Sequence, residues 1–219
     1  MTFHDHFSGH AADYAKFRPR YPASLFADLA KFCAEQNAAW DCGTGNGQAA
    51  VGLAEHFAHV MATDASAEQI AQGQPHPRVV YRVSTERSSG LSSGSQDLVT
   101  VAQALHWFDA PAFFGEVRRV LKPGGVIAVW CYGLQQLGEP FDPLLLYYYT
   151  DIVGPYWPPE RVRVEQGYRA IEFPFDETPP PAAHMEQELS LDGLMNYLGT
   201  WSATKSRTTR TSSTASAAS

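Results

Sequence analysis

Three glycines and an aspartate stand close together in the segment Asp41-Cys-Gly-Thr-Gly-Asn-Gly47. Gly43, Gly45 and Gly47 permit left-handed backbone and a close approach of a ligand to the main chain. The segment follows an apolar run and precedes a helical run, and the N-terminus of such a helix favours a negative group such as a carboxylate. The carboxylate of Asp41 would repel a phosphate and attract a cation. The segment therefore predicts a binding site for a small charged ligand.

Two ligand classes fit a glycine loop between a strand and a helix. A dinucleotide fold uses Gly-x-Gly-x-x-Gly, whereas here the third glycine comes one residue early and position 48 is Gln. S-adenosylmethionine (SAM) carries a sulfonium and an ammonium, which suit Asp41. Asp64, with Ala65 beside it, ends the next apolar run and could accept both ribose hydroxyls. The alternative role of Asp64 is to cap the following helix, which Ser66 could do instead. We expect SAM, and a nicotinamide-dependent oxidoreductase is the less favoured alternative.

Short apolar runs alternate with helical runs through the first 130 residues, which predicts parallel βαβ units in an α/β domain. A helical pattern follows Pro22, and Lys122-Pro-Gly-Gly125 predicts a turn before the last apolar run. The expected strands are 38–41, 59–63, 79–83, 97–102 and 126–130, and the expected helices between them lie near 48–57, 67–72 and 112–120.

Composition narrows the partners and the compartment. The net charge is −7, and an acidic chain argues against nucleic acid as a partner. No segment is apolar enough to span a bilayer, and the N-terminus lacks the pattern of a secretory signal. The three cysteines suit neither a disulfide framework nor a metal site. We expect a cytoplasmic protein without a metal, a monomer or weak dimer, that acts on a small molecule.

Six segments together resemble one enzyme family. They run in order across about 200 residues: Ala12-Asp-Tyr-Ala-Lys-Phe-Arg-Pro-Arg-Tyr-Pro22, Trp40-Asp-Cys-Gly-Thr-Gly-Asn-Gly-Gln48, Ala62-Thr-Asp64, Gln103-Ala-Leu-His-Trp-Phe-Asp109, Leu121-Lys-Pro-Gly-Gly125 and Tyr197-Leu-Gly-Thr-Trp-Ser202. The chain is similar to the class I SAM-dependent methyltransferases, and more narrowly to the type 11 branch that includes the trans-aconitate methyltransferases. The resemblance implies a Rossmann-like three-layer sandwich with a mostly parallel sheet, and methyl transfer to a small acceptor, for which a carboxylic acid is one candidate.

The resemblance also implies roles for individual residues. Tyr14 and Arg18 would close over the methionine end of SAM, and Glu86 would lie near the adenine. Gln103 and Ala104 would lie under the methionine, and His106 and Trp107 would face the transferring methyl group. His106 has two open roles, because it could act as a general base or could shape and hydrogen-bond the acceptor.

The rest of the chain is expected to cover the site and then to lose regular structure. Residues 1–203 form one methyltransferase domain, in which 1–22 and the aromatic insertion 133–183 form a lid. Met185–Leu189 could be a sixth strand and Leu191–Trp201 a helix. Residues 204–219 contain only Ser, Thr, Ala, Lys and Arg, which predicts a disordered tail and a missing last strand. Such an end resembles a truncated or frameshifted one, so a catalytically inactive SAM-binding protein is the alternative function.

Overall fold

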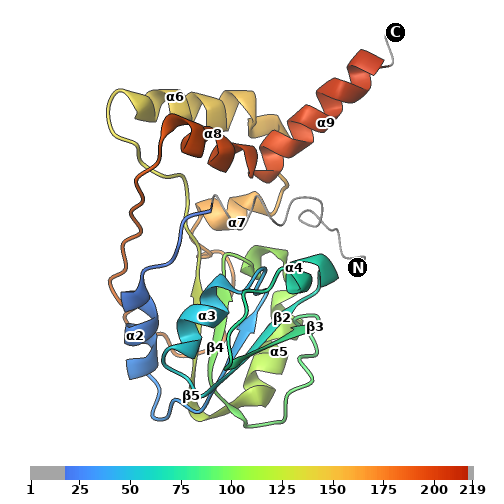
Figure 1. Cartoon of the computed structure of the whole chain (residues 1–219). Coiled ribbons are helices and arrows are strands. Elements are labelled where there is room, and N and C mark those ends of the chain that lie inside the picture. The colour runs from blue at the N-terminus through green and yellow to red at the C-terminus, as the bar shows by residue number, and fades with distance from the viewer. Residues whose placement is uncertain (1–17, 217–219) are drawn as a thin grey trace.

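The computed structural model describes residues 18–216 and places five strands in one parallel sheet of order β3-β2-β1-β4-β5. The strands are β1 (Ala38–Cys42), β2 (His59–Asp64), β3 (Val79–Val83), β4 (Gln96–Ala102) and β5 (Leu121–Trp130). The helix α2 (Ala23–Lys31) precedes β1, and α3 (Gln48–Ala54), α4 (Ala67–Ala71) and α5 (Ala110–Val120) lie between strands, with a short 3-10 helix η2 (Leu105–Trp107) before α5. Figure 1 shows the sheet with helices on both sides. The predicted α/β sandwich is confirmed, and the five strands expected between residues 38 and 130 are all present.

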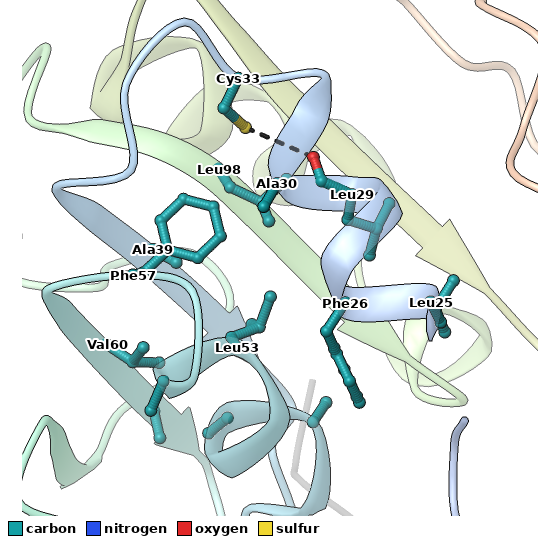
Figure 2. Close-up of a cluster of buried hydrophobic side chains, with 14 residues drawn as sticks. Leu25, Phe26, Leu29, Ala30, Cys33, Ala39, Leu53, Phe57, Val60 and Leu98 are labelled. Atoms are coloured by element: carbon teal, nitrogen blue, oxygen red, sulfur yellow. Dashed lines mark hydrogen bonds between the residues drawn. The ribbon is translucent and has the colours of Figure 1, made fainter. Parts of the chain in front are cut away.

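One face of the sheet is covered by α2 and α3 (Figure 2). Phe26 and Leu29 of α2 pack with Leu53 of α3 against Val60 and Leu98 on the strands, and all five are buried. Burying each such side chain stabilises the fold by roughly 1.5–3 kcal/mol. This apolar contact holds the start of α3, and therefore the glycine loop before it, against the sheet.

The opposite face is covered by α5. Phe113 and Val117 of this helix pack on Trp40 and Val99, and the Trp40 indole N–H donates to Thr63 Oγ1 at 2.9 Å. Asp109 caps the helix by accepting a hydrogen bond from the Ala112 backbone N–H at 3.3 Å. Residues 39–42 of β1 are buried without interruption, as expected for a parallel strand that is covered on both faces of the sheet.

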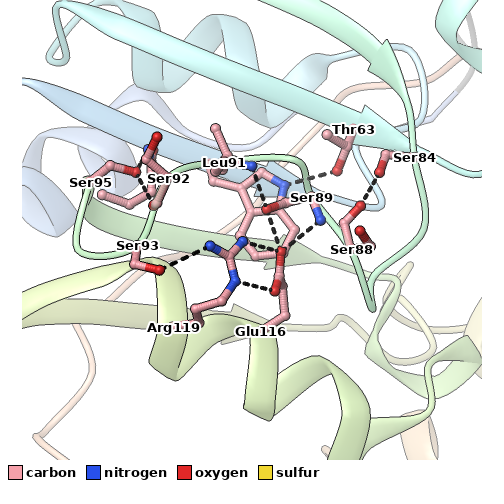
Figure 3. A network of polar contacts seen from close by, with 12 residues as sticks. Thr63, Ser84, Ser88, Ser89, Leu91, Ser92, Ser93, Ser95, Glu116 and Arg119 are labelled. Carbon is pink, nitrogen blue, oxygen red and sulfur yellow. Dashed lines mark hydrogen bonds and ion pairs between the residues drawn. The ribbon is translucent and has the colours of Figure 1, made fainter.

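A polar network ties α5 to the loop between β3 and β4 (Figure 3). Glu116 accepts hydrogen bonds from the backbone N–H and the hydroxyl of Ser89, at 2.7 and 2.6 Å. Arg119 donates to both carboxylate oxygens of Glu116, at 2.8 and 2.7 Å. These contacts hold the pKa of Glu116 down at about 2, mainly because of the Arg119 hydrogen bonds.

The rest of the described chain forms a helical cap, defined here as residues 141–165 and 191–216. It comprises α6 (Phe141–Tyr147), the π-helix η3 (Tyr148–Ile152), the 3-10 helix η4 (Gly154–Tyr156), α7 (Arg161–Glu165), α8 (Leu191–Gly199) and α9 (Ser202–Ser216). In Figure 1, α6 and α8 lie above the sheet, and α7 lies between them and the strands. Trp201 is buried at the centre of the cap, with the rings of Tyr149, Trp157 and Tyr197 within 5.9 Å of its own.

Two expectations for the C-terminal part are wrong. Met185–Leu189 is not a strand within the described chain, and its residues 186–189 are exposed, so the segment is not packed against the sheet. Residues 204–216, expected to lack regular structure, belong to α9. Near its start the helix buries Ala203, and Tyr148 Oη lies 3.1 Å from Thr204 Oγ1. Further along, Arg210 lies over the Tyr156 ring of η4, so contacts with the rest of the cap support the helix. Within the described chain no helix is long and apolar enough to cross a membrane.

Candidate functional site

A cavity of about 1490 Å³ lies over the carboxyl ends of the strands. Its walls come from the loops that follow β1, β2, β3 and β4, and from Glu160 and Arg163 of the cap. The strand order reverses between β1 and β4, and open α/β sheets bind ligands in the crevice at that switch point. The cavity exceeds the roughly 300–1000 Å³ of an ordinary small-molecule pocket, so it has room for two small molecules.

The glycine loop forms the floor of this cavity, and its three glycines have different reasons to be glycine. All three have left-handed φ values of +69°, +57° and +87° for Gly43, Gly45 and Gly47. A Cβ on Gly43 would lie 2.7 Å from the Ala104 Cβ, and one on Gly47 would lie 2.0 Å from the Tyr81 hydroxyl. Beside Gly45, the nearest atom lies 3.7 Å from such a Cβ. Only the middle glycine therefore leaves open space toward the cavity, while the outer two are required by packing.

Asp41 lies beneath the loop and not on the cavity wall. Its side chain is fully buried and accepts hydrogen bonds from Thr44 Oγ1 at 2.5 Å and Thr100 Oγ1 at 2.8 Å. Burial raises the pKa of Asp41 to about 6, against the opposing effect of these two hydroxyls. Asp41 is therefore not placed for the direct contact with a cationic ligand that the sequence predicts. Its carboxylate joins the glycine loop to β4 instead.

Asp64 is on the cavity wall together with Ala65. One carboxylate oxygen accepts the Gly45 backbone N–H and the other accepts the Ser66 backbone N–H, both at 2.9 Å. Ser66 caps α4 by accepting from the Gln69 N–H at 3.2 Å, so Asp64 is not needed as the cap. A carboxylate oxygen can accept more than one hydrogen bond, so these contacts to the backbone are compatible with binding of a ligand hydroxyl.

Gln69 is a wall residue that sequence reasoning missed. Its side chain is buried and lines the cavity, yet its Oε1 has no hydrogen-bond partner among residues 18–216. A buried acceptor without a donor is costly unless a ligand or water supplies one. This atom therefore supports a hydrogen-bonding ligand beside the glycine loop.

Glu86 lines the cavity at the end of β3, as expected. Arg87 Nε contacts Glu86 Oε1 at 3.2 Å, and the other side of the same guanidinium lies 3.0 Å from Asp109 Oδ2. Arg87 therefore joins the loop after β3 to the start of α5 at this end of the cavity.

Gln103 and Ala104 line the cavity at the end of β4. Gln103 has a left-handed φ of +57°, which is uncommon outside glycine and is often found at functional positions. Its side-chain amide both donates to the Tyr132 carbonyl at 3.0 Å and accepts from the Tyr132 N–H at 2.9 Å. The strained backbone is thus fixed between the ends of β4 and β5.

The segment before α2 also reaches the cavity. Arg18 lines it, donates to Tyr132 Oη at 3.1 Å and lies over the Tyr197 ring at 5.7 Å. Gln48 holds this segment by accepting from the Tyr21 N–H at 3.2 Å and donating to the Pro19 carbonyl at 3.1 Å. The glutamine that breaks the dinucleotide pattern therefore has a clamping role that the sequence did not reveal. Tyr14 lies outside the described residues.

His106 and Trp107 lie between the main cavity and a smaller one of about 50 Å³ beneath the cap. Their rings are 4.7 Å apart. Arg163 of α7 donates to the His106 carbonyl at 3.0 Å, and Arg161 lines the smaller cavity. Burial, together with the charges of Arg161 and Arg163, lowers the pKa of His106 to about 3. The imidazole is therefore neutral at physiological pH. Tyr168, which sequence reasoning also missed, contacts this ring through a hydrogen bond of 2.9 Å.

The comparisons with known proteins agree with this geometry. A methyltransferase domain family matches residues 40–129. A curated protein of Dictyostelium discoideum, named for methyltransferase activity, is 35% identical over 91% of this chain and 78% of its own length. The chain belongs to the class I SAM-dependent methyltransferases.

Two further methyltransferases are similar to this chain. A solved structure from Anaeromyxobacter dehalogenans, described as a type II methyltransferase, is 44% identical, with a TM-score of 0.83 over 90% of this chain and 83% of that one. The Saccharomyces cerevisiae protein CRG1, whose name describes a SAM-dependent methyltransferase, is 28% identical over 63% of this chain and 50% of its own length. Within the described residues no group of three or more His, Cys, Asp and Glu side chains is placed to hold a metal ion.

Proposed function

We propose that this methyltransferase moves the methyl group of SAM to a carboxylate oxygen of a small organic acid. The observation that carries the proposal is the positive charge beside His106, where Arg161 lines the smaller cavity and Arg163 lines the main one. In such a partly enclosed space, a guanidinium can bind a carboxylate through two parallel hydrogen bonds. The neutral state of His106 fits the same acceptor, because a carboxylate already carries the nucleophilic lone pair and needs no base.

The main cavity fits SAM. Asp64 would accept the ribose hydroxyls, and the unpartnered Gln69 Oε1 offers a further acceptor beside the same loop. Glu86 would lie near the adenine, and Arg18 near the carboxylate of the methionine. Gln103 and Ala104 would support the methionine chain from the end of β4. When bound, SAM supplies a methyl carbon made electrophilic by its sulfonium.

The chain's own contribution is to align the acceptor and to exclude water. The carboxylate oxygen would form a bond to the methyl carbon while the bond between that carbon and sulfur breaks. The electron pair of the broken bond would stay on sulfur. The products are a neutral methyl ester and a thioether, so no proton has to move. The cap and the segment from Arg18 to Pro22 would close the cavity during this step, since Arg18 already lies over the ring of Tyr197 in the cap.

The test is incubation of the purified chain with SAM labelled in its methyl group and a panel of mono-, di- and tricarboxylic acids. The panel includes the matching amides and alcohols. We expect label in methyl esters, identified by mass spectrometry, and none in the amides. Labelled methyl groups on nitrogen or carbon would contradict the proposal that the acceptor is a carboxylate oxygen. Bound SAM without any transfer would support the alternative of an inactive SAM-binding protein.

A matched pair of variants tests the arginines. Arg161→Gln should raise the acceptor KM by about 10-fold to 100-fold, since a hydrogen bond to a charged group contributes about 1.5–3 kcal/mol. The affinity for SAM should stay unchanged. Arg169→Gln removes a charge from an exposed side chain that lines neither cavity, and serves as the control. Equal effects of the two substitutions would contradict the role of Arg161.

A further inference from the structure

Tyr168 holds an unusual conformation next to His106. It follows α7 with a left-handed φ of 62°, which costs free energy for a bulky side chain. Its backbone N–H donates to the Arg163 carbonyl at 2.8 Å, and its carbonyl accepts from the Ile171 N–H at 2.9 Å. The strained turn is therefore held at both ends, and it brings the Tyr168 hydroxyl to 2.9 Å from His106 Nδ1.

The surroundings decide which partner donates in this hydrogen bond. His106 is neutral, so only one of its ring nitrogens carries a proton. Burial raises the pKa of Tyr168, so the phenol keeps its proton. The backbone N–H groups of His106 and Leu105 oppose this rise in the pKa, so donor groups lie toward the phenol oxygen. Because that oxygen already faces donors, its own proton points to Nδ1.

The other ring nitrogen then carries the proton of the imidazole. His106 Nε2 has no hydrogen-bond partner among the described residues, and His106 lines both cavities. The two rings lie 6.1 Å apart at an interplanar angle of 27°, which limits rotation of the imidazole. An N–H group is thus available to a molecule bound in the main cavity beside His106.

We propose that Tyr168 is a positioning residue that fixes His106 in its Nε2–H form, so that His106 donates a hydrogen bond to the methyl acceptor. This inference rests on the proposed function and deepens it. The Nε2–H group of His106 can bind a methyl acceptor whose reacting group offers a lone pair, such as a carboxylate oxygen. It excludes His106 from taking a proton from a hydroxyl or an amine. Acceptors that need deprotonation are therefore poor substrates.

The first measurement requires no substitution and no acceptor. The full chain, labelled with 15N in its histidines and bound to S-adenosylhomocysteine, is studied by long-range 1H–15N correlation spectroscopy. Of the eight histidines, His106 is assigned by its loss in His106→Asn. We expect a protonated Nε2 and an unprotonated Nδ1 from pH 5 to 8. A protonated Nδ1, or titration in this range, would overturn the proposal. Either result stands whether or not the acceptor is a carboxylate, so the two proposals can fail separately.

The second measurement uses Tyr168→Phe with Tyr148→Phe as its control. Tyr148 lies in the cap, with its hydroxyl on Thr204, and lines neither cavity. Tyr168→Phe should give a mixture of the two His106 tautomers and raise the acceptor KM about tenfold, with unchanged affinity for S-adenosylhomocysteine. Tyr148→Phe should leave the tautomer and KM as they are. A variant Tyr168→Phe that keeps pure Nε2–H would show that Tyr168 does not set the tautomer.

Discussion

Removal of the Asp64 carboxylate should weaken ligand binding strongly and should lower the stability of the fold only slightly. The two oxygens accept the backbone N–H groups of Gly45 and Ser66, and Asp64 lines the cavity. Two ribose hydroxyls on a charged acceptor contribute about 2–4 kcal/mol after the cost of desolvation. Asp64→Ala should therefore weaken binding of S-adenosylhomocysteine by roughly 30-fold to 1000-fold. The two backbone N–H groups can turn to water at this partly exposed loop, so the loss in stability should be near the lower end of about 1–3 kcal/mol.

Calorimetry with two ligands isolates the ribose contact. Parent and Asp64→Ala are each titrated with S-adenosylhomocysteine and with its 2′-deoxy analogue. The parent should bind the deoxy analogue more weakly than S-adenosylhomocysteine, whereas Asp64→Ala should bind the two ligands with equal affinity. Asp28→Ala removes a surface carboxylate that pairs with Lys31 and serves as the control. Equal discrimination against the deoxy analogue by parent and Asp64→Ala would refute the assignment of Asp64 to the ribose.

Three further predictions concern stability. Glu116→Gln should cost about 2 kcal/mol at pH 7, because the pKa of Glu116 is lowered to about 2 in the fold. Its partner Arg119 is partly exposed, which reduces the effect, and urea unfolding should show the difference vanish as the pH falls from about 4.5 toward 2. Gly47→Ala should lower the melting temperature far more than Gly124→Ala; both glycines have left-handed φ, but a Cβ meets Tyr81 only at Gly47. A similar loss in both would mean that Tyr81 moves aside freely. The pKa of Asp41 is raised to about 6, so the parent loses up to about 3 kcal/mol from this group as the pH rises from about 4 through 6. The free energy of unfolding of Asp41→Asn should lack this dependence on pH. Parallel pH profiles of the free energy of unfolding for the parent and Asp41→Asn would contradict the prediction.

The strands were predictable from the sequence because buried parallel strands are continuous apolar runs between turn residues. The segment 59–63, for example, was expected as a strand and is one within β2. The Lys122–Gly125 segment was expected as a turn but belongs to β5, since pairing with β4 extends to Gln96 and Leu121 across an irregularity in the register. Local turn preference cannot account for a partner strand that is distant in the sequence.

The cavity wall was only partly predictable. Asp64 could be placed because its role follows from its position at the end of a strand. The burial of Asp41 could not, because one of the two hydroxyls that hold it belongs to Thr100, 59 residues away. Tyr168 lies in a segment without any periodic pattern, and only the packing of the cap on η2 brings it to His106. The helix α9 was missed because its support comes from Tyr148 and not from its own composition.

The pairing of β1 with β4 has a consequence for the order in which a growing chain can fold. Ala39 pairs with Leu98, so the middle of the sheet stays unjoined until β4 has left the ribosome. Until then the half made of β3, β2 and β1 has a bare inner edge, which can pair with another nascent chain. The contacts of Arg163 and Tyr168 with His106 form later still. Slow translation between residues 64 and 96 should therefore increase aggregation, whereas a pause after residue 130 should be harmless, because the sheet is by then complete.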